Sequence, residues 1–107
     1  MLCNSSLFKK LYQSTNFETT TVNNLPLSKY KMIGIYHQNG DGYKMTMCYR
    51  DANKLSLNAY GNQEYNFQGF LEINWDTGSI SVTKKQGIGW NTNAFCLLYI
   101  YGLFEDN

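Results

Sequence analysis

The chain has 107 residues, of which 43% are hydrophobic and 16% are charged, which suits one domain with a modest core and argues against a second domain. Nine Lys or Arg residues and eight Asp or Glu residues give a net charge of +1, with no basic stripe to neutralise phosphates or anionic lipid headgroups. We therefore expect neither a nucleic-acid partner nor insertion into a membrane.

The aromatic residues indicate the fold class, because nine Tyr, six Phe and one Pro favour pleated, half-buried surfaces over helices. Alternating apolar and polar residues predict about eight strands, at residues 7–12, 17–22, 30–38, 43–50, 55–59, 65–75, 79–84 and 95–104. One short helix is expected near residues 25–30. The pattern predicts an all-β protein. We expect one antiparallel β-sandwich of jelly-roll type over residues 1–107, with residues 1–16 as a peripheral strand or a linker.

The segment NGDGY, residues 39–43, is the strongest hairpin signal, because Asn, Gly and Asp suit a tight turn between alternating strands. In the strand after it, four apolar residues share one face: Tyr43, Met45, Met47 and Tyr49. Asn39 and Asp41 offer oxygen atoms to a cation, but the long series of oxygen ligands typical of a calcium loop is missing. We expect no metal and no cofactor.

The segment NWDTGSI, residues 74–80, resembles the catalytic loop of dimeric aspartic proteases, in which two aspartates share one proton. In those proteases the loop comes early and a mobile flap follows it, whereas only residues 78–107 remain after Asp76 and Thr77 here. A hairpin turn requires no such additional segments, since Asp76, Thr77 and Gly78 suit a three-residue loop whose last residue has a left-handed backbone conformation. We favour the turn.

The most apolar segment is FCLLYIYGLF, residues 95–104, which is roughly half as long as a membrane-spanning helix. As a strand it has apolar side chains on both faces. One face carries Phe95, Leu97, Tyr99, Tyr101 and Leu103, and the other carries Cys96, Leu98, Ile100 and Phe104. We expect a central strand covered on both sides, or one whose outer face packs against another subunit.

The cysteines Cys3, Cys48 and Cys96 are odd in number and widely spaced, which argues against a disulfide framework and against a zinc site. The start of the chain lacks the apolar stretch of a secretory signal peptide. We therefore expect reduced thiols and folding in a reducing cytoplasm, with Cys48 and Cys96 packed inside strands.

Residues suited to catalysis are sparse. His37 is the single imidazole, it stands beside a hairpin turn, and no spacing ties it to a nucleophile or a carboxylate. The carboxylates lie mainly at expected turns and on polar strand faces, and nothing selects a catalytic pair among them. We predict that the protein is not an enzyme.

Surface recognition remains, because aromatic rings stack on the apolar faces of sugars and amides pair with sugar hydroxyls. The loop QGIGWNTN, residues 86–93, is the main candidate, although its Trp suits a plug at the end of a sandwich equally well. The predicted ligand-binding residues are Trp90, Asn91 and Asn93 in this loop, Tyr60, Asn62 and Gln63 in a second turn, and Tyr36 and His37 beside the first hairpin.

Three segments in this order resemble the C-terminal domains of phage tail fibres and prophage minor structural proteins: LPLSKYKMIGIYHQNGDGYKMTMCYR, LEINWDTGSISV and IGWNTNAFCLLYIYGLF. The resemblance implies a β-sandwich that trimerises at a fibre tip in the virion tail and contacts the bacterial cell surface. No collagen-like or coiled-coil segment precedes these motifs, so we expect an excised tip or a stand-alone relative.

The primary hypothesis is a host-recognition module of a phage tail fibre. It would bind a bacterial cell-surface saccharide without catalysis, as a homotrimer that packs through strands such as residues 95–104. The second is a small phage-encoded anti-defence or inhibitor protein that binds a host protein, since such a protein would also be short and lack catalytic motifs. The third is the aspartic protease suggested by NWDTGSI.

Overall fold

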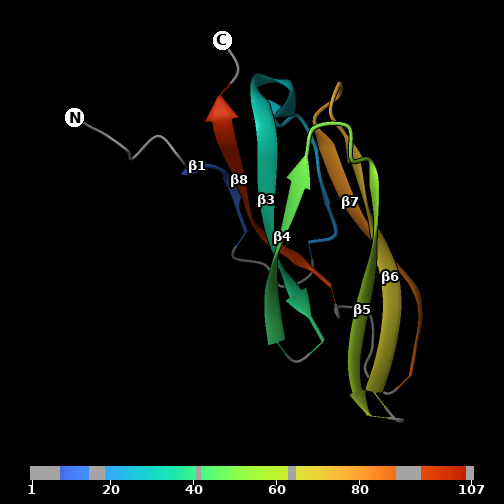
Figure 1. The fold of residues 1–107 in the computed structure, drawn as a ribbon. Helices are drawn as coiled ribbons and strands as arrows, with labels where there is room; N and C mark the ends of the chain where they lie inside the picture. The colour runs from blue at the N-terminus through green and yellow to red at the C-terminus, as the bar shows by residue number, and fades with distance from the viewer. Residues whose placement is uncertain (1–7, 15–18, 41, 63–64, 89–94, 106–107) are drawn as a thin grey trace.

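The structure is a computed structural model that describes residues 8–14, 19–40, 42–62, 65–88 and 95–105 (Figure 1). These residues form the strands β1 (Phe8–Gln13), β2 (Thr21–Val22), β3 (Tyr30–Asn39), β4 (Gly42–Tyr49), β5 (Lys54–Asn62), β6 (Tyr65–Asn74), β7 (Ser79–Ile88) and β8 (Leu97–Glu105), with a short 3-10 helix, η2 (Leu27–Lys29). All strand pairs are antiparallel, in two four-stranded sheets of order β1-β8-β3-β4 and β2-β7-β6-β5.

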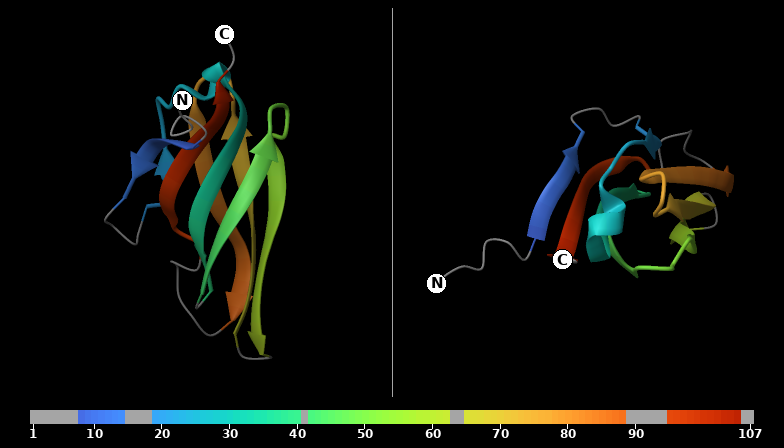
Figure 2. Two further views of the ribbon diagram at one scale, coloured as in Figure 1. Left: turned by 60° about the vertical axis from the view of Figure 1, so that its left-hand side comes forward. Right: turned by 90° about the horizontal axis from the view of Figure 1, so that it is seen from above.

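The two sheets pack face to face, as the view along the strands shows (Figure 2). Ile33 and Ile35 of β3 meet Leu71 of β6 and Ile80 of β7 in one buried cluster. Alternate residues along these strands, such as Glu72 and Ser81, lie outside the cluster, because side chains alternate along a strand. The all-β sandwich predicted from the sequence is confirmed.

A bulge in β8 changes which of its side chains face the core. Leu97 and Tyr99 pair with consecutive residues of β3, so Leu98 is an extra residue in β8. In consequence Leu97 and Ile100 both join the core, while Tyr99 lies on the outer face of the sheet. The strict alternation predicted over residues 95–104 is therefore wrong, although β8 is a central strand, as its two apolar faces suggested.

The strand predicted at residues 17–22 is shorter among the described residues. The Thr19 and Thr20 carbonyl groups accept hydrogen bonds from Leu97 of β8 and Val82 of β7, respectively. This stretch therefore bonds to both sheets in turn, and regular pairing begins only at Thr21. The helix expected near residues 25–30 is a single 3-10 turn.

The NWDTGSI segment forms the hairpin turn between β6 and β7, as we favoured. Asn74 pairs with Ser79, so the loop has four residues instead of three. The Asn74 side-chain oxygen accepts the backbone N–H groups of Asp76 at 3.1 Å and of Thr77 at 3.0 Å. Gly78 closes the turn with a φ of 76°, and its N–H donates to the Asn74 carbonyl at 2.9 Å.

Two neighbours hold this turn in place. Trp75, the first residue of the loop, packs against the core, and its indole N–H donates to the Ala52 carbonyl at 2.8 Å. The Leu25 N–H donates to the Gly78 carbonyl at 2.9 Å, and a Cβ on Gly78 would lie 2.0 Å from the Leu25 carbonyl oxygen. Position 78 therefore requires glycine for both its backbone conformation and its contact.

We predict that Gly78→Ala lowers the free energy of unfolding by more than about 2 kcal/mol, because it adds both a left-handed strain and a backbone clash. Gly42→Ala is the matched control, since a Cβ there meets nothing within 4 Å. The control should change the free energy of unfolding by less than about 1 kcal/mol. Urea denaturation measures both, and equal effects would contradict the contact with Leu25.

Candidate functional site

The strand ends next to the three predicted ligand-binding segments lie at the same end of the sandwich. β3, β5 and β7 all run toward this end, which is the lower end in Figure 1. Trp90, Asn91, Asn93 and Gln63 lie outside the described residues. The prediction that Tyr60 and Asn62 belong to a turn is wrong, because the backbone ladder between β5 and β6 continues through Asn62.

His37 is fully buried, so its predicted place on a ligand-binding surface is wrong. The alternation of β3 turns this position inward. Its Nδ1 lies 2.8 Å from the Gln38 carbonyl oxygen, and its Nε2 lies 2.8 Å from the Thr46 hydroxyl oxygen. A neutral ring satisfies both, with Nδ1–H donating to the carbonyl and the hydroxyl donating to Nε2. Burial lowers the pKa of His37 below its usual value, opposed by the hydrogen bond to Gln38 and assisted by the charge of Lys44.

Tyr36 belongs to a larger surface on the outside of the β1-β8-β3-β4 sheet, which we call the aromatic–methionine face. Cross-strand partners share a face, and the outward positions of β8, β3 and β4 are mostly apolar, whereas those of β1 are Phe8, Lys10 and Gln13. The face consists of Phe8 on β1, Tyr99 and Tyr101 on β8, Met32 and Tyr36 on β3, and Tyr43, Met45, Met47 and Tyr49 on β4.

Five rings of this face form a chain of contacts. Tyr36 stacks on Tyr43 and contacts Tyr99, with ring centroids 5.8 Å apart in each pair. Tyr99 stacks on Tyr101 at 6.1 Å, and Tyr101 meets the edge of Phe8 at 6.2 Å. These separations are typical of favourable aromatic pairs. The contacts therefore join all four strands across the outer face.

The strand β4 turns its more apolar side to solvent. Tyr49 is 72% exposed, Tyr43 is 53% exposed, and Met45 and Met47 are each 39% exposed. The alternate position Cys48 is buried in the core, because it pairs with the core residue Ile33. The sequence pattern correctly grouped these four residues on one face. The pattern did not indicate whether this face points toward the core or toward solvent.

The centre of the face lies over Gly34, which has no side chain and pairs with Met47. A Cβ at this glycine would lie 3.1 Å from the Met47 sulfur and 3.2 Å from the Met45 sulfur. The two thioethers therefore occupy the space that a side chain at position 34 would need. Because thioethers are flexible and polarizable, this centre adapts easily to the shape of a partner.

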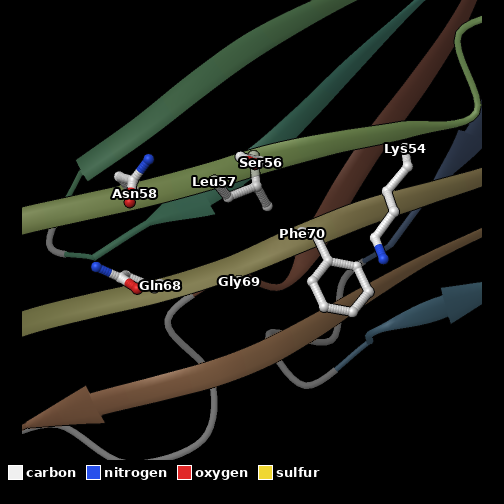
Figure 3. Close-up of a pocket in the computed structure, with 7 residues that line it drawn as sticks. All are labelled: Lys54, Ser56, Leu57, Asn58, Gln68, Gly69 and Phe70. Atoms are coloured by element: carbon white, nitrogen blue, oxygen red, sulfur yellow. The ribbon is translucent and has the colours of Figure 1, made fainter.

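The opposite sheet has a different outer surface, with a hollow of about 480 Å³ between β5 and β6 that we call the polar groove (Figure 3). Its lining is mainly polar, with one aromatic ring: Lys54, Ser56, Leu57 and Asn58 from β5, and Gln68, Gly69 and Phe70 from β6. A second hollow of about 390 Å³ adjoins the groove and shares Lys54. The polar character thus extends along the sheet.

The polar groups of the groove are available to a ligand. The Lys54 ammonium lies 4.2 Å from the centroid of the Phe70 ring, and Figure 3 shows Lys54 extending from β5 toward that ring. Among the described residues, the side chains of Lys54, Asn58 and Gln68 have no hydrogen-bond partner, although their backbones pair in the sheet. Their donors and acceptors are therefore free to bind hydroxyl groups, beside a ring that can contact an apolar surface.

Sequence reasoning did not find this groove. The available signal was Phe70, an aromatic residue at an outward position of β6, where its neighbour Leu71 faces the core. Its cross-strand partner Ser56 and the next pair, Asn58 with Gln68, are also outward. Only the pairing of β5 with β6 brings these residues together, because they are far apart in the sequence.

The described residues show little chemistry of other kinds. Within them, no three His, Cys, Asp or Glu side chains come together as metal ligands would. No helix in the described part of the chain has the length and apolar character needed to cross a membrane. One buried acceptor in the described part, Asn39 Oδ1, has no hydrogen-bond partner at the end of β3.

We predict that acid destabilises the protein through His37. Its folded-state pKa is lowered, so below the usual value of about 6.5 the unfolded state binds a proton that the folded state resists. The free energy of unfolding should therefore fall from pH 7.5 to pH 5.5, by at most about 1.4 kcal/mol per pH unit. Urea denaturation of the wild type and of His37→Gln checks this. An equally steep fall in the variant would contradict the assignment.

We predict that Cys48 and Cys96 do not react in the native state. Burial raises the pKa of the Cys48 thiol to about 11 and also raises the pKa of Cys96, whose thiol donates to Gln38 Oε1 at 3.1 Å. In a Cys3→Ser background, a disulfide reagent at pH 8 should label neither thiol until urea unfolds the chain. Rapid labelling without urea would show that one strand opens locally.

Comparisons of this chain with protein-family models, curated proteins and solved structures find no match. The resemblance to phage tail-fibre domains therefore stays a prediction that rests on the sequence motifs alone.

Proposed function

We propose that this chain is a non-enzymatic recognition module that binds a saccharide in the polar groove. The observation that supports it is the aromatic ring of Phe70, set among amide, hydroxyl and ammonium groups of the described residues that line the groove. Among the described residues, the amide groups of Asn58 and Gln68 beside this ring have no side-chain partner, so they can pair with the hydroxyl groups of a ligand.

The chemistry of the groove suits a sugar ring. One face of a pyranose is apolar through its C–H groups, and it stacks on an aromatic side chain. Asn58 and Gln68 lie opposite each other on neighbouring strands and each offers both a donor and an acceptor to sugar hydroxyls. Lys54 adds the positive charge of the groove, which favours saccharides that carry carboxylate or phosphate groups.

The biological setting is proposed from the sequence motifs. In that proposal the saccharide belongs to a bacterial cell surface and the chain acts in the tail of a virion, as its resemblance to tail-fibre domains implies. The loop residues Trp90, Asn91 and Asn93 remain candidates for further contacts, and they lie outside the described residues.

We predict that Phe70→Ala weakens saccharide binding by at least about fivefold, since a lost stacking contact of about 1 kcal/mol corresponds to that factor. A glycan array identifies the saccharide, and titration calorimetry compares the variants. Tyr49→Ala is the matched control, because it removes an exposed ring from the opposite sheet. Asn58→Ala should also weaken binding.

Two outcomes would contradict the proposal. The first is the absence of any binding on arrays that include bacterial cell-wall polysaccharides. The second is binding that Phe70→Ala and Asn58→Ala leave unchanged, which would place the saccharide elsewhere on the molecule.

A further inference from the structure

We infer that the aromatic–methionine face is the contact surface between two copies of this chain, packed face to face as a two-fold pair. The inference concerns the sheet opposite the polar groove, and it is independent of saccharide binding. The face is apolar, continuous and exposed. Contiguous apolar surfaces of this kind on proteins mark interaction sites.

The size of the face is sufficient for a weak, specific pair. With strands about 4.8 Å apart and residues about 3.4 Å apart along a strand, the face outlines roughly 14 by 20 Å. Side chains that extend beyond this outline bring it to roughly 500 Å², so two copies bury roughly 1,000 Å² in total. This value is at the lower limit for specific interfaces, and it predicts a dimer that dissociates on dilution.

The charge of the face favours a second copy over a charged partner. Its nine aromatic and methionine members carry no charge. Lys10 of β1, which pairs with Tyr101 on the same side of the sheet, adds one positive charge that is engaged by Gln13 Oε1 at 2.7 Å and lies 5.7 Å from the Tyr99 ring. A strongly charged surface would lose water on this face and gain at most this one opposite charge. A second copy presents the same neutral Tyr and Met side chains, and the net charge of +1 causes little repulsion between copies.

The edge of the sheet is less suited to association than its face. β4 is the edge strand, and it carries the exposed Lys44 opposite His37. A lysine on an edge strand hinders pairing with another strand, because the added strand would remove water from the ammonium group. Copies of this chain therefore meet through the rings of the sheet face.

Symmetry points to two copies instead of the three expected from the sequence motifs. A single self-complementary patch closes on itself around a two-fold axis, since each copy uses the same residues. A three-fold ring requires two different patches on each copy. Among the described residues, the exposed large apolar side chains lie on this one sheet face, around Gly34, except for Phe104 near the end of β8.

The test is the molar mass in solution, measured by light scattering from about 5 µM to about 500 µM, a range that covers weak interfaces. The wild type should approach the mass of two chains at the highest concentration. Met47→Lys places a charge beside the centre of the face and should weaken the dimer at least tenfold. Thr83→Lys is the matched control, because it adds the same charge to an exposed position on the other sheet and should leave the dimer intact.

A second variant guards against misfolding of the first. Tyr43→Lys changes a side chain that is already 53% exposed, and it should also weaken the dimer while the circular dichroism spectrum stays unchanged. A wild type with the mass of one chain at all concentrations overturns the inference, as does a mass of three chains or a dimer that both variants keep. If the chain stays a monomer and binds a different protein through this face, the dimer inference is overturned in favour of the inhibitor hypothesis. Saccharide binding is measured on the same samples. If the Met47→Lys and Tyr43→Lys variants still bind the saccharide, a failure of the dimer inference leaves the proposed function intact.

Discussion

The register of β3 between β8 and β4 is the constraint on which the rest of the structure depends. It places Ile35 opposite both Ile100 and Thr46, with the isoleucines in the core. The neighbouring position then has to be outward, which exposes Tyr36 and the tyrosines beside it. A slip of one residue would bury Tyr36 and put Ile35 in water, so the core and the aromatic–methionine face are fixed together.

The fold was largely predictable from the sequence, and the site was not. The alternation of Leu71 and Ile73 with polar residues identified β6, and the Asp-Thr-Gly triplet identified its turn, because both signals are local. Alternation distinguishes two faces but does not tell which one meets the other sheet when both are apolar, as in β8. The polar groove was not predicted, because it forms only where β5 and β6 lie side by side. The burial of His37 was not predicted either, because a residue beside a turn is usually exposed.

The exposed rings are less costly than their number suggests. Tyr36, Tyr99 and Tyr101 are half-buried against one another, and a tyrosine ring carries a polar hydroxyl group beside its apolar surface. Among the described residues, the most exposed aromatic ring is that of Tyr49, at the end of the edge strand. Such a face tolerates water and also releases it readily, which is consistent with association that is reversible.

The two outer surfaces of this sandwich point in opposite directions, because they belong to the two packed sheets (Figure 2). A pair joined through the aromatic–methionine faces would therefore carry its two polar grooves on its far sides, back to back. The two grooves of such a pair could not easily bind the same surface at once, but they could bind two different surfaces and cross-link them. On a suspension of cells that display the saccharide, it would act as an agglutinin.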